Sequence, residues 1–156
     1  VGVGFHPYFT VGTSVIDEAE VQIPGAAYVE FNERLVPTGK TLSVTGTPWD
    51  YRQFREVGCQ RFNHCYVQLE RDAQGMATAS LRHTARDRAI DITMDHAFSA
   101  VVVYTGDAIA DQPRAALAIE PMTCGSDAFN HPDWGLKRLV PGETFSGSYR
   151  IQLRVM

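Results

Sequence analysis

The sequence predicts an all-β protein built as an antiparallel β-sandwich. Segments rich in β-branched and aromatic residues recur about every 8 to 12 residues, with turn residues between them. Several of these segments alternate between apolar and polar residues, as strands with one solvated face do. The best helical candidate, residues 49–57, is short and mixed, so we expect a loop or a single turn there.

The first half of the chain predicts two strands followed by a hairpin. Apolar and polar side chains alternate in residues 21–23, and this pattern stops at Pro24-Gly25. The same alternation returns in residues 28–31. Pro37-Thr38-Gly39-Lys40 has the proline and glycine of a tight turn, and residues 41–44 return from it. We therefore expect the hairpin to turn at residues 37–40.

The second half predicts a further hairpin and four strands. Residues 65–69 are expected to pair with residues 77–82 through a turn at 71–75. The continuous apolar run at residues 100–104 is typical of a strand buried on both faces. The remaining strands are expected at residues 88–94, 115–119 and 149–155.

Composition favours one soluble globular domain. At 156 residues the chain can bury a real core, and its 44% hydrophobic and 21% charged residues are ordinary for a globular protein. A net charge of −4 argues against nucleic acid and against anionic membrane surfaces as partners. There is no apolar run of membrane-spanning length and no signal-peptide pattern. The odd count of three cysteines makes a reduced, cytoplasmic setting the expectation.

The cysteines predict neither a disulfide framework nor a metal site. Cys59, Cys65 and Cys124 are odd in number and contain no C-x-x-C pair. The four-ligand spacing of a zinc site is missing as well. We expect three buried thiols in a reduced compartment, and no metal.

Two segments each set one titratable side chain among apolar neighbours. His6 lies between Phe5 and the run Pro7-Tyr8-Phe9, and Glu120 follows an apolar run and precedes Pro121. A histidine and a carboxylate in such surroundings are the two parts of an acid–base catalyst. The aromatic rings beside the histidine suit a sugar, whose C–H faces pack on rings while its hydroxyls seek polar partners.

A series of short motifs spread over nearly the whole chain resembles the aldose 1-epimerase (galactose mutarotase) family. In order they are Gly4-Phe5-His6-Pro7-Tyr8-Phe9, Leu35-Val36-Pro37-Thr38-Gly39-Lys40, Gly46-Thr47-Pro48-Trp49-Asp50-Tyr51-Arg52, Phe62-Asn63-His64-Cys65-Tyr66, Val103-Tyr104-Thr105-Gly106-Asp107, Ile119-Glu120-Pro121-Met122-Thr123, Asp127-Ala128-Phe129-Asn130-His131-Pro132 and Leu139-Val140-Pro141-Gly142-Glu143. The resemblance implies a large antiparallel sandwich of roughly 300 residues, about twice this length. Residues 1–156 are then expected to form a single β-sandwich domain that is the C-terminal half of that fold.

The resemblance also implies roles for individual residues. His6 matches the family's general acid and Glu120 its general base. Asn63 stands where the family usually has an aspartate that binds sugar hydroxyls, and an amide can donate as well as accept. Val102 and Val103 stand where some members have a glutamine, so that contact is expected to be lost. The other expected substrate contacts are Tyr8, Phe9, His64 and Tyr104.

The implied reaction interconverts the α and β anomers of an aldohexose by acid–base opening and closure of the ring. It needs no redox step and no covalent intermediate, so the resemblance implies no cofactor, and the partner is a small sugar.

Two other functions remain open. The sister activity on hexose 6-phosphates would need clustered arginines, and Arg82, Arg86 and Arg88 are close in sequence. A sugar-binding module that keeps the fold without catalysis is the other alternative. Half a sandwich would also leave unpaired edges, so the missing N-terminal half or a second copy of the chain is an expected partner.

Overall fold

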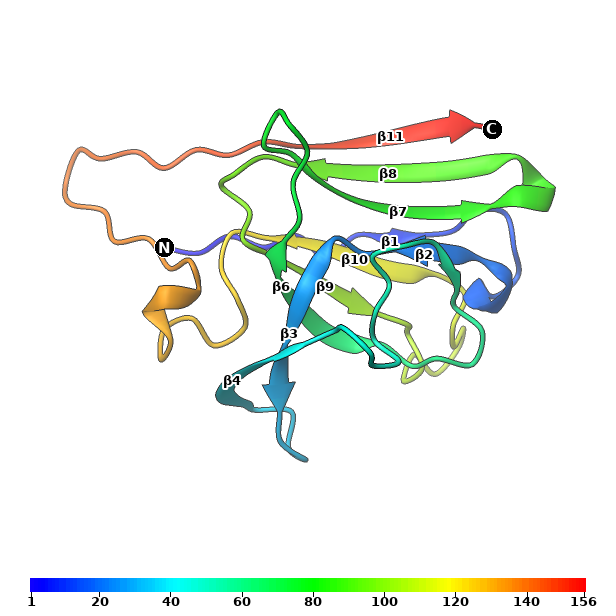
Figure 1. Cartoon of the computed structure of the whole chain (residues 1–156), viewed down its shortest axis with the longest axis horizontal. Coiled ribbons are helices and arrows are strands. Elements are labelled where there is room, and N and C mark those ends of the chain that lie inside the picture. The colour runs from blue at the N-terminus through cyan, green and yellow to red at the C-terminus, as the bar shows by residue number, and fades with distance from the viewer.

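Two antiparallel sheets make up the protein in a computed structural model that describes all residues from Val1 to Met156 (Figure 1). The strand order is β1-β10-β9-β6-β3-β4 in the six-stranded sheet and β11-β8-β7-β2-β5 in the five-stranded sheet. The strands are β1 (Tyr8–Phe9), β2 (Glu20–Gln22), β3 (Gly25–Phe31), β4 (Pro37–Ser43), β5 (Arg55–Glu56), β6 (Asn63–Leu69), β7 (Ala77–His83), β8 (Arg88–Met94), β9 (Ala100–Tyr104), β10 (Leu117–Met122) and β11 (Tyr149–Val155). The predicted all-β antiparallel architecture is confirmed.

Helical structure is confined to three single turns of 3-10 helix. These are η1 (Ile16–Glu18), η2 (Thr84–Arg86) and η3 (Pro132–Trp134). None of them has the length or the apolar character that a membrane-crossing helix needs. Residues 49–57 form turns that end in the short strand β5, in agreement with the predicted loop.

The main core lies between the two sheets. Alternate residues of each strand point into it, because successive side chains of a strand face opposite sides. Leu81 and Ile92 enter from the five-stranded sheet, and Val103 and Ile119 enter from the six-stranded sheet, all fully buried. The residues in between on the six-stranded sheet point to its other face, which we call the outer face.

The outer face of the six-stranded sheet carries a second, smaller apolar cluster. Val29, Cys65 and Ala100 form it, with Val102 and Met122 packed against them. This sheet is therefore apolar on both faces, in contrast to the clean alternation of a sheet with one solvated side. The outer face is the surface on which the candidate site is built.

Three strands were predicted with their observed bounds, whereas one hairpin turn was misplaced and one strand pairing was wrong. β8, β9 and β11 occupy the expected residues 88–94, 100–104 and 149–155. The β3–β4 hairpin forms, but it turns at residues 32–36. The Asn32 side chain accepts hydrogen bonds from the backbone N–H groups of Arg34 and Val36 there, as asparagine does in tight turns.

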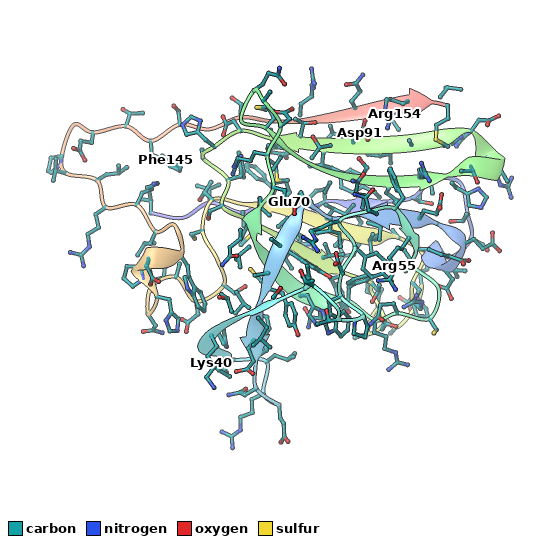
Figure 2. All side chains as sticks on the ribbon, viewed as in Figure 1. Lys40, Arg55, Glu70, Asp91, Phe145 and Arg154 are labelled. Atoms are coloured by element: carbon teal, nitrogen blue, oxygen red, sulfur yellow. The ribbon has the colours of Figure 1, made fainter.

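The expected turn Pro37-Thr38-Gly39-Lys40 instead lies inside β4. Gly39 has a φ of 86°, and the pairing of β3 with β4 shifts register between Val29 and Phe31. The glycine thus serves a β-bulge rather than a hairpin turn. Figures 1 and 2 show the hairpin projecting from the body, with Lys40 on it.

The predicted hairpin between residues 65–69 and 77–82 does not exist. β6 lies between β9 and β3 in one sheet, whereas β7 lies between β8 and β2 in the other. The turn after β6 therefore passes from one sheet to the other. Arg71 holds that crossing by donating to the backbone oxygens of Gly75, Asp95 and Phe98.

Candidate active site

Glu120 projects from β10 onto the outer face of the six-stranded sheet. Its neighbours Leu117 and Ile119 point into the main core, so alternation places the Glu120 side chain on the opposite side. The carboxylate is well sheltered, with only 10% of its side chain exposed. Burial of a lone carboxylate disfavours its charged form and therefore requires a partner nearby.

His6 is that partner, and the N-terminal segment brings it there. The segment runs beside β10: the Val3 N–H donates to the Thr123 hydroxyl at 2.8 Å, and the Phe5 N–H donates to the Pro121 carbonyl at 3.1 Å. His6 Nε2 consequently lies 3.3 Å from Glu120 Oε1. The imidazole is 55% exposed, so the pair has a sheltered side and a solvent side.

The surroundings of the pair perturb the acid–base behaviour of Glu120 and of the neighbouring Tyr8. Burial raises the pKa of Glu120 above its ordinary value, and the charge of protonated His6 works against that rise. Tyr8 stacks on His6, with ring centroids 5.0 Å apart and an interplanar angle of 27°. Burial raises the pKa of Tyr8 as well, and the nearby Tyr104 and Glu120 add to the effect. The imidazole is thus held between a tyrosine ring and a carboxylate.

A small apolar floor extends from Glu120 across the outer face. In the register of the strands, Glu120 is opposite Val102, and Val102 is opposite Cys65. A cavity of about 160 Å³ lies over this floor. Its lining consists of Phe31, Leu35, Asn63, His64, Cys65, Val102 and Ser126. Small apolar side chains beneath polar neighbours are suited to one face of a sugar ring.

A larger cavity of about 500 Å³ adjoins the first. The two share four lining residues, namely Phe31, Leu35, Asn63 and His64. Aromatic rings of Trp49, Phe62 and Tyr104 contribute to its wall, and so do the polar side chains of Arg61 and Asp107. Neither His6 nor Glu120 lines it.

His64 enters these cavities as a neutral imidazole. Its ring packs on Trp49, with centroids 3.9 Å apart, and burial lowers its pKa to about 4. Its Nδ1 accepts the backbone N–H of Asn63 at 3.1 Å. The proton of the neutral ring must therefore reside on Nε2, which makes that atom a hydrogen-bond donor.

The structure brings six of the seven predicted site residues to the outer face or its cavities. His6, Tyr8 and Glu120 form one group. Asn63, His64 and Tyr104 line the larger cavity, and Tyr104 is opposite both Ala118 and Asn63 in the sheet. Phe9 is not brought there, because it is opposite Leu117 and packs against the main core.

Several lining residues were missed in the sequence. Cys65 and Val102 sit across the sheet from Glu120, and Ser126 closes the smaller cavity. Cys65 and Val102 are spaced evenly from Asn63 on β6 and from Tyr104 on β9, but that spacing becomes informative only when the pairing of the strands is known. The sequence predicts only a lost contact at Val102, and it carries no signal for Ser126.

The arginines considered for phosphate recognition lie elsewhere. Arg82 is on β7 of the five-stranded sheet, where it donates to Glu20 at 2.8 Å and covers the ring of Phe54. Arg86 lies in η2, and Arg88 begins β8. None of the three lines either cavity beside the pair.

The cysteines are all free, and they differ in burial. Cys65 is buried and Cys124 is partly buried, but Cys59 is exposed, so the expectation of three buried thiols is wrong for Cys59. No group of three histidine, cysteine or acidic side chains is close enough together to hold a metal ion.

Comparison with known proteins is consistent with this arrangement. Galactose mutarotase from Mus musculus is 28% identical over 161 aligned residues, covering 90% of this chain and 46% of that protein. Maltose epimerase from Levilactobacillus brevis is 30% identical over 146 residues, covering 83% of this chain and 42% of that protein. The chain therefore spans about half the length of the curated relatives it matches.

Solved structures share the fold. An aldose epimerase homologue from C. elegans superimposes with a TM-score of 0.78 at 19% identity, covering 98% of this chain and 49% of that one. A galactose mutarotase-like protein from Clostridium acetobutylicum superimposes with a TM-score of 0.78 at 20% identity, covering 100% of this chain and 48% of that one. The family profile for aldose 1-epimerase matches residues 1–152. Because the match covers all but the last four of the 156 residues, the chain belongs to the aldose 1-epimerase family.

Proposed function

We propose that the protein interconverts the α and β anomers of a free aldohexose by acid–base opening and closure of the pyranose ring. The observation that carries the proposal is the approach of His6 Nε2 to Glu120 Oε1, at 3.3 Å, beside a small apolar floor. The reaction needs one proton acceptor and one proton donor at two oxygens that are bonded to the same carbon. Two groups within a few ångström of each other can reach both oxygens.

Ring opening begins with ionised Glu120 and protonated His6. The carboxylate takes the proton of the C1 hydroxyl, and the C1 oxygen becomes a carbonyl as the bond between C1 and the ring oxygen breaks. The imidazolium donates its proton to the departing ring oxygen, which becomes the C5 hydroxyl. One proton is taken and one is given, so the site stays balanced in charge.

Ring closure is the reverse sequence on the other face of the aldehyde. C1 rotates about the C1–C2 bond, the C5 hydroxyl attacks the carbonyl, His6 takes back a proton and Glu120 returns one. Each positioned proton transfer typically contributes about 10²–10⁴-fold. Burial raises the pKa of Glu120 and so makes the ionised carboxylate a stronger base.

Binding of the sugar is assigned to polar groups around the floor. Asn63 can donate to and accept from a hydroxyl, and His64 Nε2 can donate to one. Tyr8 and Tyr104, near Glu120, offer two phenolic hydroxyls at the rim. Support for these assignments is that Asn63, His64 and Tyr104 line the cavities and that Tyr8 stacks on His6.

The direct test uses the anomers themselves. Freshly dissolved α-D-galactose and α-D-glucose are followed by NMR, with and without protein, as the β anomer appears. The proposal predicts equilibration that is faster in proportion to protein concentration. Retained sugar binding with unchanged equilibration would instead indicate a non-catalytic sugar-binding module.

A further inference from the structure

We propose that Thr123 is a positioning residue: its buried hydroxyl fixes the register in which residues 1–7 lie along β10, and so holds His6 opposite Glu120. The inference rests on the proposed anomer exchange, because it explains how the acid of that reaction is kept at the base. It assigns a role to a side chain that lies outside the acid–base pair and lines neither cavity.

His6 and Glu120 are cross-strand neighbours. The residues on either side of them are joined by hydrogen bonds of 3.1 Å and 3.3 Å, from the Phe5 N–H to the Pro121 carbonyl and from the Ile119 N–H to the Pro7 carbonyl. Residues that lie between two such hydrogen-bonded pairs of an antiparallel ladder face each other, with their side chains close together. A slip of one residue would turn the imidazole to the other face of the sheet.

The backbone ladder that sets this register is incomplete. In a regular antiparallel ladder, two residues of a hydrogen-bonded pair exchange two bonds. Pro7 and Pro121 have no N–H, so each of their pairs keeps only one bond. In the third pair, the Thr123 N–H donates to the Val3 carbonyl at 2.9 Å, but the Thr123 carbonyl accepts from the Ser99 hydroxyl at 3.0 Å and not from Val3.

The hydroxyl of Thr123 takes the place of the missing acceptor. It accepts the Val3 N–H at 2.8 Å and donates to the Val3 carbonyl at 3.1 Å. One residue therefore binds both backbone groups of Val3, and that residue is only 4% exposed. Of the three pairs that flank or precede His6, this one has the most hydrogen bonds.

Side-chain packing leaves much of the segment uncovered. Val1, Val3 and Phe5 are 52%, 46% and 40% exposed, so the segment buries little apolar surface for its length. The Phe5 ring packs on Tyr149, with centroids 4.8 Å apart. Apolar burial is non-directional, whereas a hydrogen bond demands a defined distance and angle, so the bonds of Thr123 are the contacts that select one register.

Thr123→Val is the direct test of this role. Valine keeps the β-branched shape and removes only the hydroxyl. Thr123→Ser keeps the hydroxyl and is the rescue variant. Thr78→Val is the matched control, because Thr78 loses a comparable bond, to the Thr93 hydroxyl at 3.2 Å, on the five-stranded sheet.

The kinetic readout separates positioning of the acid from binding of the sugar. We expect Thr123→Val to lower kcat for α-galactose about tenfold or more through misplacement of the acid. KM should stay within about threefold of wild type, because Asn63, His64 and Tyr104 lie on β6 and β9. Thr123→Ser and Thr78→Val should keep the wild-type kcat.

Three kinetic outcomes would overturn the role of Thr123 and spare the proposed function. They are an unchanged kcat in Thr123→Val, a loss confined to KM, and a loss in Thr123→Ser as large as that in Thr123→Val. Each requires that the wild-type protein still converts the sugar.

A second variant removes the same bond from the other side, in case Thr123→Val does not fold. Val3→Pro deletes the N–H that the Thr123 hydroxyl accepts, at a residue that is 46% exposed. Val3→Ala keeps that N–H and is its control. Loss of kcat in Val3→Pro alone supports the role, and equal kcat in the two variants rejects it.

Amide hydrogen exchange tests the register without any sugar. The N–H groups of Phe5 and Ile119 bind partners other than Thr123, so their exchange reports on the whole segment. They should exchange at least about fivefold faster in Thr123→Val than in wild type or Thr123→Ser. If the wild-type protein does not convert the sugar, the proposed function fails, and this exchange alone decides whether Thr123 fixes His6 opposite Glu120; equal exchange in all variants rejects it.

Discussion

His6 and Glu120 are far apart in the sequence and approach to 3.3 Å because the N-terminal segment runs along the edge of β10. The pair is asymmetric: the imidazole is 55% exposed, and the carboxylate side chain is 10% exposed. In the proposed mechanism the sugar enters from the solvent side, past the histidine, and its C1 hydroxyl meets the sheltered base.

The pH dependence of anomer exchange should reflect the raised pKa of the buried Glu120 carboxylate. Glu120 must be ionised to accept a proton, and burial raises its pKa above the ordinary value of 4.5. The rate should therefore fall, as pH is lowered, through an apparent pKa above 4.5. The check is kcat/KM for α-galactose measured from neutral to acidic pH. If kcat/KM falls with an apparent pKa at or below 4.5, the assignment of Glu120 as the base is contradicted.

The same carboxylate should lower stability at neutral pH. With its pKa raised in the folded state, the folded protein binds more protons than the unfolded chain between the two pKa values, so stability falls as pH rises through that window. Glu120→Gln should raise the Tm at neutral pH, and the gain should shrink below the ordinary pKa. Glu33→Gln, at an exposed turn residue, is the control and should leave the Tm unchanged. A Tm for Glu120→Gln below that of wild type at neutral pH would sink this prediction.

Tyr8 should act by orienting His6. The two rings stack with centroids 5.0 Å apart, and the imidazole is otherwise 55% exposed, with Glu120 at 3.3 Å. Tyr8→Phe keeps the ring, so kcat should stay within a few fold of wild type, whereas Tyr8→Ala should lower kcat about tenfold or more through misplacement of the acid. Steady-state kinetics of both variants decide the matter. Equal losses in the two would assign the effect to the hydroxyl instead.

Arg114 should be a major contributor to stability near the larger cavity. It donates to Asp17 at 2.7 Å and to Asp107 at 3.0 Å, and also to the backbone oxygens of Gly58 and Gln60, with 16% of its side chain exposed. Arg114→Met leaves these acceptors without their donor and should cost about 3 kcal/mol of unfolding free energy.

A matched control for Arg114→Met exists on the same carboxylate. Arg61 contacts Asp107 at 3.5 Å, but its side chain is 83% exposed. Arg61→Met should therefore cost less than about 1 kcal/mol. Urea unfolding of both variants is the measurement, and losses of similar size would show that burial does not set the strength of this network.

The free edge of the five-stranded sheet should promote association. β11 leaves Leu153 77% and Val155 87% exposed, whereas Arg154 beside them is paired with Asp91 (Figure 2). An unpaired edge with apolar side chains is prone to pair with another strand. Light scattering of the 156-residue chain should show association that Leu153→Lys with Val155→Lys reduces; a monomer at every concentration would refute it.

The sequence could predict strands but not the sheets to which they belong. Residues 88–94 and 149–155 alternate regularly, so their bounds were readable from the side-chain period alone. For residues 65–69 and 77–82 the same period cannot tell a hairpin from a passage between two sheets, because both give alternating segments joined by a turn. What decides is that β6 pairs with β9 and β3 while β7 pairs with β8 and β2, and those pairings depend on the rest of the fold.

The site was predictable to a similar degree. His6 and Glu120 stood out because each is a lone titratable group in an apolar motif. The floor of Val102 and Cys65 depends on the register of three strands, which local patterns do not contain. Phe9 was expected beside Tyr8 at the site, but adjacent strand residues face opposite sides, so only one of them could be there.

The most direct test of the account is the rate of anomer exchange in His6→Asn, Glu120→Gln and the double variant. If the two side chains act as one acid–base unit, each single variant should lose at least about 10²-fold in kcat/KM, and the double variant should be little worse than either. A single variant that equilibrates α-galactose at the wild-type rate would contradict the paired roles of these two residues.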